Sequence, residues 1–281
     1  MHGTGPALRF PPAIANYIPA RDRAAMIAVI LAGSRPGTDP LLAGTDYPSK
    51  ALYPVAGQPM LAHVLRAVSE SGHFDRVVVA AQQPDLLRAD PAIAAAAPGA
   101  EWRTSGATIA ATMRELLGAL EGPLLVTTAD NVLLSPSTIG EFLTASEGAD
   151  IAVGMVEQRT YRAAGIDAPR TWLPFRGGKW SGANLFRLSG AQVEPVLARW
   201  AEVEQARKKG RKVIGAFGLV PLLGAALRFS TIQSFAAGIG RRYGLDARAI
   251  SLSAAEACVD ADKPSDIPVI EDVLARRAGV A

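Results

Sequence analysis

Residues 26–65 read MIAVILAGSRPGTDPLLAGTDYPSKALYPVAGQPMLAHVL, and every later assignment in the chain depends on this stretch. It begins with six consecutive apolar residues, 26–31, a run too short to be a helix. Such a run predicts a strand that is buried on both faces of a parallel sheet. The residues that follow the strand are small, polar or basic, so the strand is expected to lead directly into a binding loop.

The predicted loop combines small residues with positive charge. Leu31, Ala32, Gly33 and Ser34 let backbone N–H groups approach a phosphate closely, and these four residues are predicted to contact a nucleotide. Two basic residues of the same loop, Arg35 and Lys50, are predicted to be catalytic. The loop therefore suits a nucleoside triphosphate.

The next segments predict a parallel crossover. Residues 58–71 carry apolar side chains at a helical period, and Gly72 follows them as a helix stop. Residues 76–81 form a second apolar run that predicts a buried strand. A strand, a helix and a strand in so short a span indicate a right-handed crossover unit and an α/β fold.

The stretch also carries a longer motif. It reads LAG-x-R-x-G and then P-x-K-x-L-x-P-V-x-G-x-P-x-L-x-x-x-L. This string resembles the signature of the MobA-like and sugar-nucleotide nucleotidyltransferases, which couple a nucleoside triphosphate to a phosphorylated acceptor and release pyrophosphate. The chain departs from the family pattern in two places, since Ser49 separates Pro48 from Lys50 and the loop from Arg35 to Tyr47 is long.

The resemblance implies an architecture as well as an activity. The expected fold is a Rossmann-like, mixed and mostly parallel sheet with helices on both faces. One nucleotidyltransferase domain would span residues 26–281, with an acceptor-binding lid at 157–188 and a helical insertion at 190–245. Residues 1–25, interrupted by four prolines, are expected to form an arm on this domain.

Composition limits the alternatives. With 281 residues and 49% hydrophobic content, the chain can bury a large core. Its net charge is +3, and basic and acidic residues are interspersed over most of the length, so nothing indicates nucleic-acid binding. Cys258 is the single cysteine, so an internal disulfide is excluded, and one cysteine with three histidines gives no zinc pattern. A reducing cytoplasm is the expected location.

A second small-residue segment precedes a predicted helix at 104–120. Ser105, Gly106 and Thr108 open this helix, and the resemblance places Gly106 and Thr108 against the nucleotide base. The alternative is an ordinary helix start with Ser105 or Thr108 as the capping residue.

Two acidic segments are candidate metal sites. A strand predicted at 122–128 ends in Ala129 and Asp130, at the sheet edge where ligands bind in open α/β folds. The resemblance implies that Ala129 contacts the nucleotide and that Asp130 holds Mg²⁺ against its phosphates. Asn131 is expected to cap the turn.

The second acidic segment, DADKPSD at 260–266, resembles the closing D-x-P-x-D motif of the family. Aligned on it, Asp262 becomes the second metal ligand, and Asp260 lies close enough to compete. The alternative for Asp262 is that it caps the helix that follows.

The segment 157–188 is rich in cations and aromatic residues. A hairpin is predicted around Gly177 and Gly178. The resemblance places the acceptor site here, with cations facing the phosphate of the acceptor. The candidate acceptor-binding residues are Arg159, Arg162, Arg170, Lys179 and Asn184.

A basic cluster and an apolar stretch occupy residues 207–229. The stretch is too interrupted for a membrane span, which needs about 20 apolar residues. A peripheral contact with anionic lipid, a homodimer interface and burial in the core all remain open for it.

The resulting hypothesis is a nucleotidyltransferase that transfers CMP from CTP, with Mg²⁺, to a small phosphorylated acceptor such as a phosphoglycerate or a polyol phosphate. The product would be an activated head group for lipid or envelope synthesis. The alternatives are a GT-A glycosyltransferase that uses a nucleotide sugar and a non-catalytic nucleotide-binding regulator. The text Ala129-Asp130-Asn131 lacks the D-x-D of most such glycosyltransferases.

Overall fold

The fold comes from a computed structural model, which describes residues 26–33, 39–106, 108–208 and 229–279. For residues 202–208 it describes the backbone course only. Several predictions lie outside the described residues: the N-terminal arm at 1–25, Ser34, Arg35, and the apolar stretch except for Phe229.

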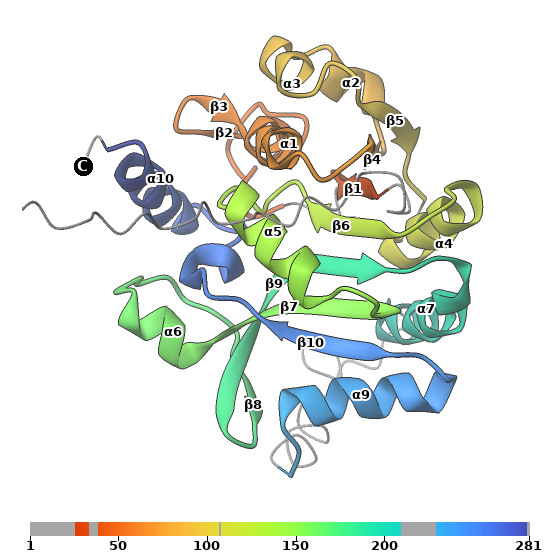
Figure 1. Ribbon diagram of the computed structural model, residues 1–281. Helices are drawn as coiled ribbons and strands as arrows, with labels where there is room; N and C mark the ends of the chain where they lie inside the picture. The colour runs from red at the N-terminus through yellow and green to blue at the C-terminus, as the bar shows by residue number, and fades with distance from the viewer. Residues whose placement is uncertain (1–25, 34–38, 107, 209–228, 280–281) are drawn as a thin grey trace, which may run out of the picture.

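One sheet of 8 strands organises the domain (Figure 1). Its order is β10-β7-β9-β6-β1-β4-β5, and β8 pairs with β9 outside this path. The pairs β1–β4, β1–β6, β4–β5 and β7–β10 are parallel, whereas β9 runs antiparallel to both β6 and β7. The strands are β1 Ile27–Leu31, β4 Arg76–Ala81, β5 Glu101–Thr104, β6 Leu124–Thr128, β7 Ile151–Glu157, β8 Leu173–Phe175, β9 Gly178–Leu188 and β10 Ala247–Ser251. The predicted α/β class with a mixed, mostly parallel sheet is confirmed.

Helices cover both faces of the sheet. Alternate side chains of a strand point to opposite faces, and in β1 both sets are apolar and pack against helices. Ala28 and Ile30 of β1 belong to a core cluster with α1, α5 and α10, whereas Ile27 and Val29 belong to a second cluster with α4 and α7. The helices are α1 Met60–Ser71, α2 Pro84–Arg88, α3 Pro91–Ala96, α4 Ile109–Ala119, α5 Pro136–Ala145, α6 Gln158–Ala163, α7 Glu194–Lys208, α9 Ile232–Tyr243 and α10 Asp266–Arg277.

The structure corrects the extent of the predicted lid. Residues 185–188 are not a lid but the second half of strand β9, which lies in the middle of the sheet between β6 and β7, whereas the first half of β9 pairs with β7 and β8. Neighbours on both sides bury Leu185 and Leu188, so this segment is part of the core. The hairpin of β8 and β9 is present, with Leu173 opposite Trp180 and Phe175 opposite Gly178.

Strand β10 is an element that the sequence did not predict. Its residues, ARAIS, contain no continuous apolar run, because this strand lies at the edge of the sheet and only Ala247 and Ile250 are buried. It pairs in parallel with β7 and places the 252–266 segment beside the carboxyl ends of the central strands.

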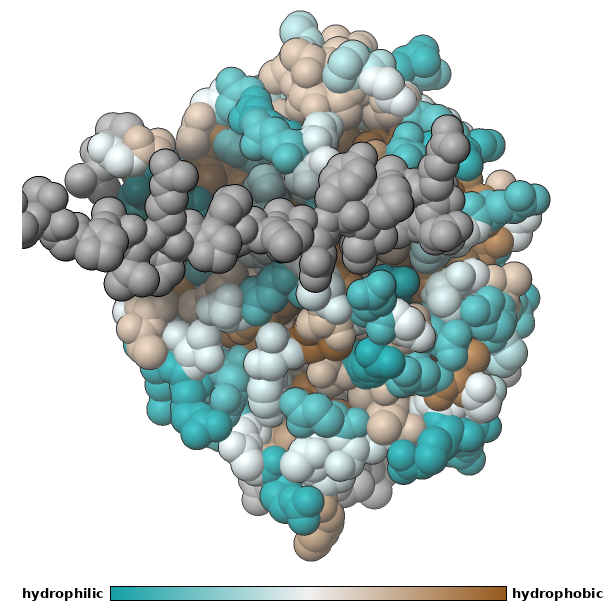
Figure 2. Space-filling view, in the orientation of Figure 1, coloured by the Kyte–Doolittle hydropathy of each residue, from teal (hydrophilic) through white to brown (hydrophobic). Residues whose placement is uncertain are grey.

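A small two-stranded hairpin connects the beginning of the chain to its end. Strands β2 (Pro54–Val55) and β3 (Gln58–Pro59) pair, and the backbone N–H of Ala56 between them donates to Glu271 of α10 at 2.8 Å. Hydrophilic side chains cover much of the visible outer rim (Figure 2). Within the described ranges no helix is long and apolar enough to cross a membrane.

Candidate active site

Three residues from distant parts of the chain meet at one point. The Lys50 ammonium donates to Oδ2 of Asp130 at 2.8 Å and to Oδ1 of Asp262 at 2.6 Å. Eighty residues separate Lys50 from Asp130, and 212 separate it from Asp262, so only the fold brings them together. We refer to Lys50, Asp130 and Asp262 as the open cluster, since 53% of the Asp262 side chain is exposed.

Asp130 is positioned by the end of β6. The N–H of Ala129 donates to the carbonyl of Leu31 at 3.0 Å, which extends the pairing with β1 to the residue before Asp130. The Thr128 hydroxyl then donates to Oδ1 of Asp130 at 2.5 Å. One oxygen of the carboxylate is thus held by β6, while the other faces Lys50.

Asp262 is positioned by a buried aspartate four residues further on. The Asp266 carboxylate, only 2% exposed, accepts the N–H groups of Asp262 at 3.0 Å and Lys263 at 2.9 Å. The N-terminal cap position of α10 is Ser265, so Asp262 does not cap this helix, and that alternative is wrong. The N–H of Ala261 donates to the carbonyl of Asp130 at 3.1 Å, which joins the two acidic segments directly.

Lys50 begins the 3₁₀ helix η1 (Lys50–Leu52), whose N-terminus is capped by the Ser49 hydroxyl. Burial lowers the pKa of Lys50, but the charges and hydrogen bonds of Asp130 and Asp262 outweigh this effect. The pKa therefore lies above its usual value, and the side chain is a cation at neutral pH.

A second cluster lies beside the first, and its guanidinium is largely buried. Arg170 forms an ion pair with Asp260 and donates to the carbonyl of Cys258 at 2.7 Å, and only 10% of its side chain is exposed. A further oxygen, Oδ1 of Asp266, lies 3.9 Å from the guanidinium. We refer to Arg170, Asp260 and the Cys258 carbonyl as the closed cluster.

Asp260 is held from two sides. Besides Arg170, the side-chain amide of Asn184 donates to its Oδ2 at 3.3 Å. Burial raises the pKa of Asp260; the Arg170 charge opposes this and the carboxylates of Asp262 and Asp130 add to it, leaving the pKa above its usual value. Burial likewise raises the pKa of the Cys258 thiol to about 12, so this thiol stays protonated at neutral pH.

The open cluster has the donor set that Mg²⁺ prefers. Two carboxylates converge on one cation, the Lys50 ammonium, so the site accommodates positive charge. Mg²⁺ commonly takes one or two carboxylates and completes its octahedron with phosphate oxygens and water. The described residues contain no group of three or more His, Cys, Asp or Glu side chains that could hold a metal. A magnesium ion here would therefore take its remaining oxygens from water or from a bound phosphate.

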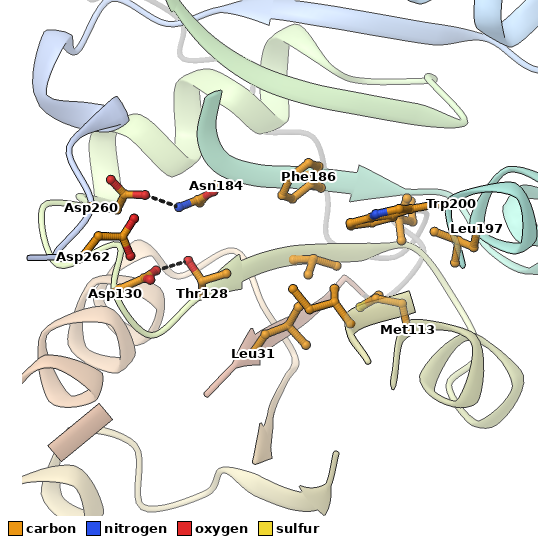
Figure 3. Close-up of a pocket in the computed structure, with 13 residues that line it drawn as sticks. Leu31, Met113, Thr128, Asp130, Asn184, Phe186, Leu197, Trp200, Asp260 and Asp262 are labelled. Carbon is orange, nitrogen blue, oxygen red and sulfur yellow. Dashed lines mark hydrogen bonds between the residues drawn. The ribbon is translucent and has the colours of Figure 1, made fainter. Parts of the chain in front are cut away.

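A cavity of about 230 Å³ opens beside these residues. Its polar end is formed by the aspartates of the two clusters together with Thr128 and Asn184, and its other end by apolar side chains of the strands and of α4 and α7 (Figure 3). The lining residues are Leu31, Ile109, Met113, Val126, Thr128, Asp130, Asn184, Phe186, Leu188, Leu197, Trp200, Asp260 and Asp262.

The predicted nucleotide-binding residues lie along the edge of the sheet at this end. Ala32 continues β1, with its N–H on the carbonyl of Ala80 at 2.8 Å. Thr108 caps α4 by accepting the N–H of Ala111 at 3.0 Å, and Gly106 donates to the Thr112 hydroxyl at 3.0 Å. The capping alternative for Thr108 is therefore confirmed, and contact of Gly106 or Thr108 with a base stays a prediction.

The predicted acceptor-binding residues separate into two groups. Asn184 lines the cavity, and Arg170 reaches it indirectly through Asp260. Arg159 and Lys179 are exposed, and Arg159 pairs with Glu157 at 2.7 Å. Arg162 is also exposed, and neither it nor these two residues line the cavity.

Sequence reasoning missed three contributors. Asp266 is the second aspartate of the D-x-P-x-D segment, so the motif carried a signal for it. Thr128 immediately precedes the Ala129-Asp130 turn, and its hydroxyl points toward the carboxylate. Trp200 of α7 had no sequence signal, because its place in the cavity depends on how α7 packs against α4 and β9.

Comparison with known proteins agrees with this geometry. The profile of the MobA-like NTP transferase domain matches residues 28–222. The chain belongs to this family. The predicted resemblance to nucleotidyltransferases is thus confirmed, and nucleotidyl transfer is the activity that family membership supports. No curated protein matched the sequence.

Solved structures show the same fold. A hypothetical transferase from Thermus thermophilus has a TM-score of 0.67 at 25% identity, over 86% of this chain and 99% of that chain. A CMP:2-keto-3-deoxy-manno-octonic acid synthetase complexed with CTP has a TM-score of 0.54 at 12% identity, over 90% and 99%. A 4-diphosphocytidyl-2C-methyl-D-erythritol synthase has a TM-score of 0.54 at 16% identity, over 90% and 99%.

Proposed function

We propose that the protein transfers a nucleoside monophosphate from an NTP, with CTP favoured, to a small phosphorylated acceptor and releases pyrophosphate. The observation that carries this proposal is the open cluster, in which Lys50 binds both Asp130 and Asp262, and these two aspartates line the polar end of the cavity. A cation and two converging carboxylates at the carboxyl ends of β1 and β6 suit a bound triphosphate.

In the proposed reaction, an acceptor phosphate oxygen attacks the α-phosphorus in line. A P–O bond forms there, and the bond from the α-phosphorus to the β-phosphate oxygen breaks. A phosphate monoester is largely ionised at neutral pH, because its second pKa is about 6, so no side chain has to remove a proton. The residues of the chain position the reactants and neutralise charge.

Lys50 has the central role in this proposal. Its ammonium would stabilise the charge that grows at the α-phosphate, and Arg35 with the loop amides would hold the outer phosphates. Asp130 and Asp262 would hold Mg²⁺, which when bound supplies charge neutralisation on the triphosphate. Thr128 and Asp266 keep the two carboxylates oriented toward each other.

CTP is favoured because of the segment that opens α4. The Ser105 hydroxyl is buried without a hydrogen-bond partner, next to Gly106. The small residues Gly106 and Thr108 leave space for a flat ring to approach the backbone, which would suit a pyrimidine. The two cytidylyl enzymes among the similar folds are consistent with this preference but identify only the fold.

The test is to incubate the full chain with Mg²⁺, each NTP in turn and a panel of phosphorylated acceptors, and to measure pyrophosphate. Release that depends on both one NTP and one acceptor is the expected result. Lys263→Met is a matched control, since Lys263 is exposed and its ammonium takes no part in the open cluster. The control should keep full activity, whereas Lys50→Met should lose it.

The same assay distinguishes the two alternatives. Release of UDP from a nucleotide sugar, with no pyrophosphate from any NTP, would assign the chain to glycosyl transfer. Tight nucleotide binding with neither product would leave the non-catalytic regulator. Either result would overturn the proposal.

A further inference from the structure

The cavity has two chemically different ends. The lining residues with polar side chains, Thr128, Asp130, Asn184, Asp260 and Asp262, gather at one end (Figure 3). Beyond them, the described lining residues are aliphatic or aromatic, and the indole N–H of Trp200 is the single polar group that they offer. We call this second part the apolar trough.

The trough has considerable length. Asn184 and Leu188 of β9 both line the cavity, and they lie four residues apart on one strand. At about 3.3 Å per residue, the trough extends roughly 13 Å from the polar end toward the start of β6. Leu188 is paired there with Leu124, the first residue of β6.

The walls of the trough carry apolar side chains that remain partly open to solvent. Leu31, Ile109 and Phe186 are half-buried, and Trp200 is 40% exposed, although they face a cavity between a sheet and two helices. Exposed apolar surface that is contiguous and concave commonly marks a ligand site. Fully buried side chains, Met113 and Val126 among them, form its floor.

We propose that the trough holds the apolar body of the acceptor, so that the second substrate is a phosphomonoester of an alkyl or similarly apolar alcohol. This inference rests on the proposed function and names the chemical class of its acceptor. The phosphate of the acceptor would lie at the polar end beside the open cluster, and its hydrocarbon would lie along Phe186 and Trp200.

Two other occupants fit less well. A polyhydroxylated acceptor would leave its hydroxyl groups without partners along the trough, at an energetic cost for each. A pyrimidine base requires polar partners along one edge, and such groups are found at the start of α4 near Ser105 rather than near Leu188. Hydrocarbon requires no such partners.

The experiment measures pyrophosphate release by the full chain with Mg²⁺ and its preferred NTP, using ethyl, butyl and hexyl phosphate as acceptors. Burying each methylene should raise kcat/KM about threefold to fourfold, which gives about 10²-fold between ethyl and hexyl phosphate. Trp200→Ala should flatten this dependence. Ile239→Ala, which removes a 39% exposed side chain of α9 outside the cavity, should leave it unchanged.

Calorimetry with the same alkyl phosphates separates this inference from the proposed function. If no acceptor yields pyrophosphate but hexyl phosphate still binds more tightly than ethyl phosphate, and Trp200→Ala removes the difference, the trough assignment holds and the proposed function fails. If pyrophosphate forms equally well with every chain length, or only with polar acceptors, the proposed function holds. The trough then serves another occupant, such as a second copy of the chain, and this inference is overturned. Absence of both turnover and chain-length-dependent binding overturns both.

Discussion

The open and closed clusters are built from the same kinds of charge, yet they differ in the exposure of one carboxylate. Arg170 and Asp260 have 10% and 22% of their side chains exposed, and the guanidinium is also bound to the Cys258 carbonyl. In the open cluster Lys50 and Asp130 are similarly buried, with 16% and 20% of their side chains exposed, but Asp262, two residues after Asp260, is 53% exposed. Asp260 and Asp262, which only Ala261 separates in the sequence, thus have different surroundings.

The difference suggests a division of roles. The planar guanidinium of Arg170 reaches several oxygens of one loop, an arrangement suited to a fixed structural contact. The Lys50 ammonium is a compact point charge on a flexible stem, which can move from carboxylates to a phosphate. We expect the closed cluster to maintain the 258–266 loop and the open cluster to exchange its cation when substrate binds.

Replacing Arg170 should have the largest effect on stability. Arg170→Met leaves the Asp260 carboxylate buried without its main partner, and breaking such a pair costs about 3–5 kcal/mol. The free energy of unfolding, measured by urea titration, should fall by this amount. A change below about 1 kcal/mol would show that Arg170 is not a structural residue.

The double variant Arg170→Met, Asp260→Asn sharpens this test. Removing the second charge as well should restore a large part of the lost stability, because the buried carboxylate is then neutral. Losses that simply add would contradict a direct coupling between the two side chains.

Replacing Lys50 should affect activity more strongly than stability. Lys50→Met removes a charge contact that the proposed reaction uses in its transition state, so turnover should fall roughly 10²-fold or more. The free energy of unfolding should fall less than in Arg170→Met, because one of the two carboxylates that lose their cation, Asp262, is 53% exposed and is solvated, although Asp130 is 20% exposed. Equal losses of turnover and stability would place Lys50 in the structure of the loop instead of in the reaction.

The two neighbouring aspartates should differ in their effect on the magnesium requirement. Asp262→Asn should raise the Mg²⁺ concentration that gives half-maximal turnover by about tenfold, because a metal ligand is lost. Asp260→Asn should leave that concentration unchanged, because the Asp260 carboxylate already pairs with Arg170 and accepts a hydrogen bond from Asn184. The opposite pattern would assign the second ligand position to Asp260.

The sequence allowed much of this architecture to be predicted from local patterns. The apolar runs at 26–31 and 76–81 are strands β1 and β4, because central parallel strands are buried on both faces and leave a continuous signal. The edge strand β10 left no such signal, and it was missed. The resemblance places all of 157–188 in the lid, whereas the second half of β9 lies in the sheet, because its pairing with β6 and β7 depends on elements distant in the sequence.

In the candidate site, too, residues within local motifs could be predicted, whereas contacts between distant parts of the chain could not. Lys50, Asp130 and Asp262 belong to short motifs, so the sequence could nominate them before their distances were known. The separate partners of Asp260 and Asp262 could not be predicted, because Arg170 is 90 residues from Asp260 and no local pattern links them. The apolar trough also depends on packing between elements: Phe186 falls in the predicted lid and Trp200 in the predicted helical insertion, and no local pattern brings the two together.

Asn184 connects the closed cluster to the cavity. Substitutions at this residue should have the smallest effect on the free energy of unfolding. Asn184 lies where the register between β7 and β9 shifts. Its backbone φ is 47°, a positive value that residues other than glycine rarely adopt. Asparagine tolerates this conformation better than alanine does. Its amide also donates to Asp260 at 3.3 Å.

Two substitutions at Asn184 separate backbone strain from the lost hydrogen bond. Asn184→Gly removes the amide but accepts the positive φ, whereas Asn184→Ala removes the amide and also adds strain. The alanine variant should therefore be less stable than the glycine variant by about 1 kcal/mol in urea unfolding. If both variants lose stability equally, the contact with Asp260 and not the backbone conformation explains why asparagine suits this bulge.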